Sequence, residues 1–253
     1  MTLSLIDWHT RFTQQAHWTQ DLRNYIYGQI AIKNVKKILD VGCGTGVLED
    51  ELIEQTTANI FGLDINPEYI AFAIKHTSNI SYAFGDAHNL PYSSGAFDIT
   101  LCHFLLLWVQ NPQQVIQEMV RVTTPGGSVI ALAEPDYGGR IDYPSQLAQL
   151  GRWQRDALQM QGANPLIGRE LRALFNRAGL VEVEVGVLGG QWKDYTDTED
   201  LETEWLVLQS DLLQNSDFLM SEEDLKIRDA IARETGQRIL FVPTFYAWGR
   251  VKG

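Results

Sequence analysis

The sequence predicts an α/β protein built on a doubly wound, mostly parallel β-sheet. Seven short apolar segments each have the length of one strand, and they fall at residues 38–41, 60–63, 80–84, 97–103, 129–133, 181–188 and 245–251. Most are separated by segments whose apolar residues recur at helical spacing, and such alternation is typical of βαβ units. At 253 residues, the chain is long enough for one large α/β domain with insertions.

A glycine turn at the end of the first strand is the strongest functional signal in the sequence. Asp40 lies in this strand, and Gly42, Gly44 and Gly46 follow it at alternate positions. Glycine allows backbone conformations that a Cβ forbids, and it lets the backbone approach a ligand closely. The turn therefore predicts a ligand held against the backbone at the end of the first strand.

The segments after the turn complete a βαβ unit. Residues 47–55 carry apolar residues at helical spacing, and the strand at 60–63 ends at Asp64. An acid at this point is placed to accept hydrogen bonds from a ribose diol. Ile65 follows the acid and is placed to pack against an adenine face, although packing in the core explains it nearly as well. The unit predicts a nucleoside-binding site.

The spacing of the glycines separates two classes of ligand. A dinucleotide fingerprint, GxGxxG, needs a glycine where Val47 stands. The pattern DxGxGxG that begins at Asp40 instead resembles the class I S-adenosylmethionine-dependent methyltransferases. This resemblance implies that Asp40 holds the amino group of the methionine portion, directly or through water, and that Asp64 binds the ribose. It also places four loop residues at the cofactor: Gly42, Cys43, Gly44 and Gly46.

The third predicted strand is followed by another acid, Asp86. The resemblance implies that Asp86 accepts a hydrogen bond from the adenine amino group and that the backbone of Ala87 lies near the ring. An Asp in a Gly-Asp turn is also a common turn former. Because Asp86 is the third acid at consecutive strand ends, the binding role is favoured. His88 is expected to face solvent and is given no role.

The fourth strand ends with Cys102 and His103, beside the glycine turn at the topological switch point of a doubly wound sheet. We expect Cys102 to lie at the cofactor. His103 is the candidate general base, because an imidazole with a pKa near 6.5 can take a proton from a substrate. The alternative is a pocket wall or a bond to a lid. Methyl transfer needs mainly proximity and alignment, so a base is dispensable.

The same strand end bears on the acceptor. Family members that methylate amines of nucleic acids or glutamine side chains typically carry an Asn/Asp-Pro-Pro-Tyr motif there, whereas this chain has Cys-His-Phe-Leu at 102–105. The segment Glu-Pro-Asp-Tyr at 134–137 comes after the fifth strand and is interpreted as a solvated turn into an insertion. The turn at 124–127, Thr-Pro-Gly-Gly, resembles that of members acting on small molecules. A small-molecule acceptor is therefore expected.

Helical additions surround the predicted core in a single domain, 1–253. Residues 1–35 are rich in aromatics and are predicted to form a helical lid, with Gln15, Trp18 and Tyr25 contacting the cofactor. The alternative is an amphipathic helix pair packed on the sheet edge. The remaining divisions are a cofactor-binding core at 36–134, helical insertions at 135–165 and 189–238, and a terminal strand region at 239–253. The acidic residues of the second insertion are interpreted as a solvated face rather than a cation site.

Composition excludes several other classes of function. The net charge of −12 disfavours a nucleic-acid partner, because phosphate binding relies on Lys and Arg. The two cysteines form no CxxC motif or Cys/His cluster, so no metal site is predicted. The longest apolar run, 104–109, is too short to span a bilayer, and the N-terminus shows no secretory signal. These observations favour a cytoplasmic protein with no membrane partner.

The predicted function is methyl transfer from S-adenosylmethionine to a small molecule by direct displacement, with S-adenosylhomocysteine as the product. One alternative is a non-catalytic protein that keeps the nucleoside pocket, because no catalytic residue is obligatory in this chemistry. An NAD(P)-dependent oxidoreductase is disfavoured by the glycine spacing and by the late final strand. An RNA or protein methyltransferase is disfavoured by the acidic charge and the missing Pro-Pro motif.

Overall fold

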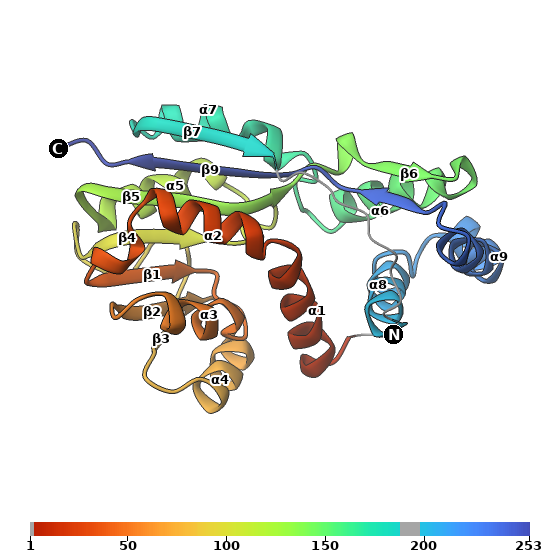
Figure 1. Cartoon of the computed structure of the whole chain (residues 1–253), viewed down its shortest axis with the longest axis horizontal. Helices are drawn as coiled ribbons and strands as arrows, with labels where there is room; N and C mark the ends of the chain where they lie inside the picture. The colour runs from red at the N-terminus through yellow and green to blue at the C-terminus, as the bar shows by residue number, and fades with distance from the viewer. Residues whose placement is uncertain (1–2, 188–197) are drawn as a thin grey trace.

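The computed structural model describes residues 3–187 and 198–253 of the chain. Within them, a seven-stranded sheet has the order β3-β2-β1-β4-β5-β9-β7 (Figure 1). Neighbouring strands are parallel except at β9, which runs antiparallel to β5 and to β7. The predicted doubly wound, mostly parallel fold is confirmed. The strands are β1 (Lys37–Val41), β2 (Asn59–Asp64), β3 (Ser81–Phe84), β4 (Phe97–Cys102), β5 (Thr123–Pro135), β7 (Val181–Val187) and β9 (Thr244–Arg250).

Helices cover both faces of this sheet (Figure 1). Helices α2 and α3 pack on one face and α5 and α7 on the other, while α4 flanks β2 and β3. The α-helices are α1 (Leu5–Trp18), α2 (Gln20–Gln29), α3 (Val47–Gln55), α4 (Pro67–His76), α5 (Pro112–Val122), α6 (Ala148–Met160), α7 (Leu171–Arg177), α8 (Thr198–Asp211) and α9 (Ser216–Glu234). Short 3-10 turns lie at η1 (Ile32–Asn34), η2 (Tyr137–Gly139), η3 (Ser145–Leu147) and η4 (Ile167–Glu170).

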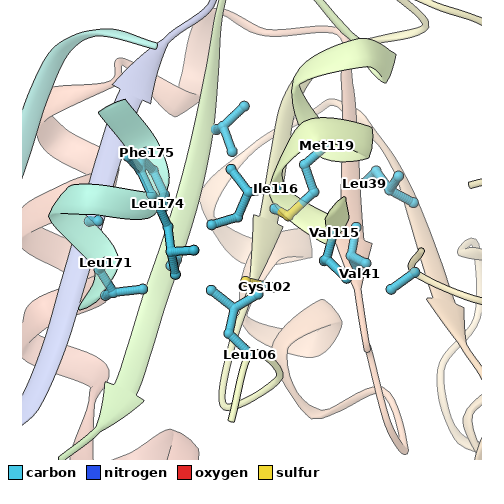
Figure 2. Close-up of a cluster of buried hydrophobic side chains, with 14 of the residues drawn as sticks. Leu39, Val41, Cys102, Leu106, Val115, Ile116, Met119, Leu171, Leu174 and Phe175 are labelled. Carbon is cyan, nitrogen blue, oxygen red and sulfur yellow. The ribbon is translucent and has the colours of Figure 1, made fainter. Parts of the chain in front are cut away.

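The central strand β1 is buried on both faces, as its apolar run predicts. Leu39 and Val41 face the cluster formed with α5 and α7 (Figure 2), whereas Ile38 faces the cluster formed with α2 and α3. Alternate residues of a strand point to opposite faces, so Asp40 shares the α2 and α3 face with Ile38. This places a carboxyl group inside the protein beside the glycine turn.

A second unit, here called the cap, consists of α6, α8, α9 and the antiparallel strands β6 (Ile141–Tyr143) and β8 (Ile239–Phe241). It lies beyond the end of the large sheet (Figure 1). It has its own apolar core, made up of Leu147, Leu150, Ala157, Trp205, Leu208, Leu212, Phe218, Leu225 and Ala232. The insertions predicted from the sequence therefore pack mainly against one another.

Two predicted segments differ in detail from the structure. The helix expected from Tyr143 begins at Ala148, because Pro144 disfavours a helical conformation for the residue before it. Residues 239–241, expected in the terminal strand region, form β8 and pair with β6 instead of joining the large sheet. The predicted strand residue Leu188 and the acidic residues Asp194 and Asp197 lie outside the described residues.

Helix α1 lies between the large sheet and the cap (Figure 1), where it contacts α3 and α8. The Ser4 hydroxyl caps its N-terminus by accepting a hydrogen bond from the Asp7 N–H, and the Asp7 carboxylate accepts one from the Ser4 N–H. Over residues 3–187 and 198–253, no helix has the length and apolar character needed to cross a membrane.

Candidate active site

The glycine loop between β1 and α3 has a conformation that other residues rarely adopt. Gly42, Gly44 and Gly46 have φ angles of +79°, +55° and +86°. A Cβ added to Gly42 would lie 2.7 Å from Leu105 Cδ1, in the loop after β4. The glycines therefore serve both the turn itself and the close packing of the neighbouring loop.

Asp64, at the end of β2, is bonded to this loop. Its Oδ2 accepts a hydrogen bond from the Gly44 N–H (2.9 Å), and its Oδ1 accepts one from the Asn66 N–H (2.8 Å). Burial raises the pKa of Asp64, while these backbone donors oppose the rise. Each carboxylate oxygen keeps further acceptor capacity, so the geometry leaves room for the ribose contact that the sequence predicts.

Asp40 has no partner comparable with those of Asp64. Its side chain is almost fully enclosed, with 1% of the residue exposed, and neither oxygen has a hydrogen-bond partner among the described residues. Burial, followed by the charge of Asp64, raises the pKa of Asp40 to about 8. A buried polar group without a partner is costly, so this carboxyl group is a candidate for binding a ligand or water.

Helix α1 covers the loop, but through residues other than those predicted. The His9 ring Nδ1 lies 2.9 Å from Thr45 Oγ1, and a Cβ added to Gly44 would lie 3.2 Å from the Phe12 ring. The Phe12 ring also meets Tyr69 of α4 edge to face at 5.6 Å. His9 and Phe12 are three residues apart and so share one helix face, and this spacing is the signal that could have identified them.

The three predicted lid contacts lie elsewhere. Trp18 is partly exposed at the end of α1, where the Arg11 guanidinium lies 4.7 Å from its ring centre. Gln15 is half-buried, and its carbonyl accepts the Thr19 hydroxyl. Contacts of Trp18 and Gln15 with a cofactor stay predictions.

The prediction for Tyr25 is wrong. Its hydroxyl donates to Glu184 Oε1 at 3.1 Å, and its ring meets Tyr246. Because Glu184 belongs to β7 and Tyr246 to β9, Tyr25 lies over the strands farthest along the sheet from the glycine loop.

Comparison with known proteins identifies the domain that carries this geometry. Residues 39–131 match the family described as a methyltransferase domain, a range that begins in β1 and ends in β5. The range contains Asp40, the glycine loop, Asp64 and His103. The chain therefore contains a methyltransferase-family domain, and this domain holds the motif that resembles the class I S-adenosylmethionine-dependent methyltransferases.

Individual relatives match over part of their length. Norajmaline N-methyltransferase from Rauvolfia serpentina is 35% identical over 107 residues, which is 40% of this chain and 37% of that protein. Across the curated relatives compared, the matched part covers 34–55% of their own length.

Solved structures share the fold at low sequence identity. A chain of the complex between the Haloferax volcanii Trm112 methyltransferase activator and the putative methyltransferase has a TM-score of 0.61 at 17% identity, covering 98% of this chain and 96% of that one. The [4+2]-cyclase SpnF has a TM-score of 0.55 at 18% identity, covering 92% and 82%. These likenesses show the methyltransferase fold, and a fold alone does not determine a reaction.

The residues predicted to surround the adenine differ in exposure. Ile65 is 63% exposed, so the alternative that it packs in the core is wrong. Ala87 is buried. The Asp86 side chain is 52% exposed and accepts the His88 N–H at 2.9 Å.

His88, which the sequence analysis left without a role, holds Asp86 in place. Its Nδ1 lies 2.7 Å from Asp86 Oδ1, and its Nε2 lies 3.3 Å from the Asn111 N–H. A ring that accepts at Nε2 donates at Nδ1, so this arrangement aims an N–H at the carboxylate. The His88 N–H and the ring together lower the pKa of Asp86. In the sequence, the signal for this contact is that His88 follows Asp86 by two residues within a turn.

His103 is held by the N-terminal helical segment. Its Nε2 lies 2.9 Å from the hydroxyl of Thr19, the residue between α1 and α2. Arg23, itself buried, donates to the same hydroxyl. Burial, followed by the positive charge of Arg23, lowers the pKa of His103 to about 3. The ring therefore stays neutral near pH 7 and is a weak proton acceptor, which favours the alternative role of bonding to the lid.

Glu134 and Asp136 do not form the solvated turn that the sequence suggested. Glu134 is fully buried, and its carboxylate accepts three successive backbone N–H groups, those of Leu105 (3.0 Å), Leu106 (2.8 Å) and Leu107 (3.2 Å). Asp136 is also buried and forms an ion pair with Arg169. Glu134 thus fixes the loop after β4, the same loop that packs against Gly42.

Both cysteines are buried free thiols. Cys43 lies in the glycine loop, and burial raises the pKa of its thiol. The Cys102 side chain lies inside the cluster with α5 and α7 (Figure 2), so a contact with the cofactor would have to come from its backbone. Within the described part of the chain, no three His, Cys, Asp or Glu side chains are grouped closely enough to hold a metal ion.

Proposed function

We propose that this protein binds S-adenosylmethionine and transfers its methyl group to a small-molecule acceptor by direct displacement. The observation that carries the proposal is the glycine loop with a partnerless buried acid, Asp40, on one side and Asp64 on the other. This arrangement lies in a methyltransferase-family domain. The chain matches less than two thirds of the length of these relatives, so the methyl-transfer activity and the acceptor are proposals for the whole protein.

Different residues would bind different portions of the cofactor. Asp40 is placed to hold the amino group of the methionine portion, and the backbone of Gly42, Cys43, Gly44 and Gly46 to line it. Asp64 is placed to accept from the ribose, while Ile65, Asp86 and Ala87 surround the adenine. When bound, S-adenosylmethionine supplies an electrophilic methyl group on a sulfonium.

The chain's contribution to the reaction is then mainly alignment. His103 and Thr19 connect the loop after β4 to the lid, and Glu134 holds the next three residues of that loop in place. Such rigid support keeps a nucleophile and a methyl group in line, which is the principal requirement of this chemistry. No step needs His103 as a base. A proton on the acceptor atom, where there is one, passes to water.

The nature of the acceptor rests on charge and on the missing motif. The net charge of −12 and the sequence at 102–105 support a small molecule over a nucleic acid. We also propose that the protein acts in the cytoplasm, where its two free thiols remain reduced.

A calorimetric titration with S-adenosylhomocysteine, and a parallel one with NADH, tests the cofactor. We expect micromolar binding of the first and none of the second. Binding of NADH alone would contradict the proposal. Gly44→Val should abolish the binding, because φ at this position is +55° and the added side chain would meet Phe12. Circular dichroism checks that this variant is folded.

Transfer of labelled methyl groups to a panel of small acceptors then tests the activity. Turnover with any acceptor supports the enzyme. Tight binding without turnover across amine, hydroxyl, thiol and carbon nucleophiles would favour the non-catalytic alternative.

A further inference from the structure

A second buried acid lies behind the glycine loop. Glu49, in the first turn of α3, is fully buried, and neither of its carboxyl oxygens has a hydrogen-bond partner among the described residues. Asp40 has the same two properties. We call Asp40 and Glu49 the carboxyl pair. No motif in the sequence marks Glu49 as functional.

Gly62 shows that the two acids are neighbours. In the sheet, Gly62 of β2 lies directly opposite Asp40 of β1. A Cβ added to Gly62 would lie 2.7 Å from Glu49 Oε1, so the Glu49 carboxyl group packs against this glycine. Both acids therefore occupy the α2 and α3 face of the sheet, side by side, and the absence of a side chain on Gly62 makes the room for Glu49.

An unpartnered hydroxyl points to the same place. Tyr27 of α2 is 3% exposed, its hydroxyl has no hydrogen-bond partner among the described residues, and both acids of the pair act on it electrostatically. It is a donor available to whichever oxygen of the pair carries charge. The site thus contains two acids and the Tyr27 hydroxyl without hydrogen-bond partners among the described residues, and the Tyr82 hydroxyl, on which Glu49 acts electrostatically, has none there either.

Among the described residues, no cationic side chain forms an ion pair with Asp40 or Glu49. Arg23 acts on Asp40, but its guanidinium is bonded to Glu51, with Nε 2.9 Å from Oε1. The charged and titratable groups that face the pair come from α2, α3, the glycine loop, β2 and β3: Arg23, Tyr27, Cys43, Asp50, Glu51, Asp64 and Tyr82. Six of the seven, all except Arg23, are acids, and a negative charge on any of them disfavours a second charge on the pair.

Two adjacent carboxyl groups in a dry site do not both ionise, because like charges repel strongly at low dielectric. Burial raises the pKa of Glu49 well above its usual value, as it does for Asp40. The pair therefore holds a proton near pH 7 in the free protein, and that proton belongs to the pair rather than to either residue.

We propose that Glu49 is a positioning residue for the cofactor: it shares a proton with Asp40 in the free protein, and the pair releases this proton when a ligand's cationic amino group binds beside Asp40. The proton passes to solvent, the pair becomes doubly negative, and the amino group supplies a positive charge directly beside it. This inference rests on the proposed function, because it takes the amino group to be that of the methionine portion.

Proton release is measurable without knowing the acceptor. S-adenosylhomocysteine is titrated into the protein by calorimetry at pH 7, in phosphate and in Tris, whose ionisation enthalpies differ. We expect a buffer-dependent enthalpy that corresponds to nearly one proton released per ligand. The affinity should rise with pH, by up to about tenfold per unit, over the range in which the pair still holds its proton in the free protein. 5′-Methylthioadenosine, which lacks the amino acid portion, should bind with no release.

Glu49→Gln separates the proposal from a structural role. Glutamine keeps the shape, donates a hydrogen bond to Asp40 and carries no ionisable proton, so the variant should bind S-adenosylhomocysteine with no buffer dependence. Glu54→Gln is the matched control, because Glu54 is exposed on the same helix, and it should keep the release.

The outcomes distinguish this inference from the proposed function. Binding of S-adenosylhomocysteine to the natural protein with the same enthalpy in both buffers overturns the inference and leaves the cofactor assignment standing. Release that persists in Glu49→Gln also overturns it. Absence of any binding overturns the proposed function, and this inference with it. If Glu49→Gln does not fold, the comparison of the two ligands on the natural protein still decides.

Discussion

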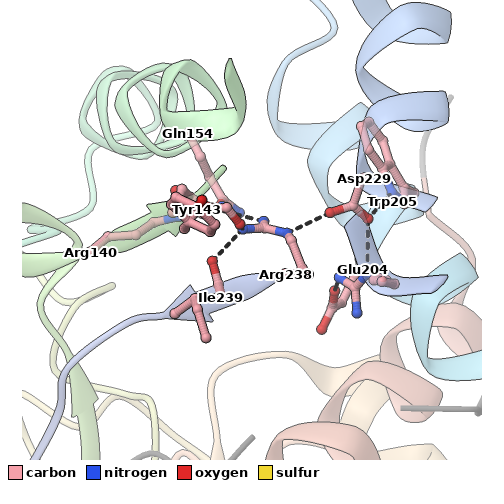
Figure 3. A network of polar contacts seen from close by, with 10 residues as sticks. Arg140, Tyr143, Gln154, Glu204, Trp205, Asp229, Arg238 and Ile239 are labelled. Atoms are coloured by element: carbon pink, nitrogen blue, oxygen red, sulfur yellow. Dashed lines mark hydrogen bonds and ion pairs between the residues drawn. The ribbon is translucent and has the colours of Figure 1, made fainter. Parts of the chain in front are cut away.

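The buried carboxyl groups Asp142 and Asp229 of the cap are partnered, whereas the carboxyl pair behind the glycine loop is not. In the cap, Asp142 accepts from Arg140 (2.7 Å) and Arg238 (2.8 Å), and Asp229 accepts from Arg238 (2.6 Å) and Arg233 (2.9 Å) (Figure 3). The side chains of Asp142, Asp229 and Arg238 are at most 5% exposed. Asp40 and Glu49 are as deeply buried, yet their four carboxyl oxygens are without hydrogen-bond partners in the described residues.

The difference separates two uses of a buried charge. A network in which every member is satisfied fixes one arrangement of the elements that carry it, here β6, β8 and α9. Acids left unsatisfied lower stability, and they persist where a ligand will supply the missing partner. The cap network is therefore interpreted as structural and the carboxyl pair as functional.

The largest effect is expected from breaking the cap network at its centre. Arg238→Ala leaves Asp142 and Asp229 each short of one partner in a buried site, so the free energy of unfolding should fall by about 3–5 kcal/mol. Urea unfolding measures the loss. Arg228→Ala is the control, since it removes an exposed ion pair with Asp224 from the same region of the chain, and it should change stability little. Equal losses for both variants would mean that the network contributes no more than a surface pair.

The sequence predicts one of these regions far better than the other, for a physical reason. The glycine loop and Asp64 belong to one continuous βαβ unit, so their spacing along the chain reports their spacing in space. The cap network joins residues near 140 to residues near 230 and 238, and nothing local marks which charges will meet. The fold class was predictable from the alternation of strands and helices, whereas the β6–β8 pair was too short to give a pattern.

Glu49 shows the same limit within the predicted region. It stands in an acidic stretch at the start of α3, where acids are usually exposed and favoured by the helix dipole. Its burial depends on Gly62, a residue of the next strand, and on Tyr82 beyond it. The contacts of His9 and Phe12 with the glycine loop were not predicted from the sequence for a similar reason, because they depend on the path of α1 in the folded protein.

Asp64→Ala tests whether a partnered acid at the loop also serves a ligand. We expect affinity for S-adenosylhomocysteine to fall by about 1–3 kcal/mol, through loss of charge-assisted hydrogen bonds. Calorimetry gives the value. Asp98→Ala is the matched control, because Asp98 also accepts two backbone N–H groups, of Lys36 and Lys37, at the start of β1 rather than its end. Similar affinity losses in both variants would assign the Asp64 effect to the backbone alone.

Glu49→Leu should affect stability in the opposite direction from the cap variant. Replacing an unpartnered buried carboxyl group with an apolar side chain of similar length removes a desolvation cost, so the free energy of unfolding at pH 7 should rise by about 1–2 kcal/mol. Denaturant unfolding checks the sign. A fall of the size seen for Arg238→Ala would show that Glu49 has a structural partner, and the contrast between the two regions would then disappear.

The smallest effect concerns His103. Its ring is buried near the cation Arg23, as an unsatisfied group would be, but it also has a hydrogen-bond partner in Thr19. Its pKa is about 3 in the folded protein and about 6.5 in the unfolded chain, so only the unfolded state gains a proton as the pH falls below 6.5. His103 therefore contributes no pH dependence above pH 6.5, and stability falls as the pH drops from there toward 3. Between pH 6.5 and 5.5 the loss is at most about 1 kcal/mol.

His103→Gln keeps a polar group near Thr19 and should reduce this loss, whereas His17→Gln, at an exposed position of α1, should not. Unfolding curves at the two pH values give the comparison. If the natural protein and His103→Gln lose the same stability on acidification, the imidazole takes up protons equally in the folded and unfolded states, and its pKa in the folded protein is close to 6.5. It would then be a stronger proton acceptor than its surroundings indicate, and the general-base role would regain its support.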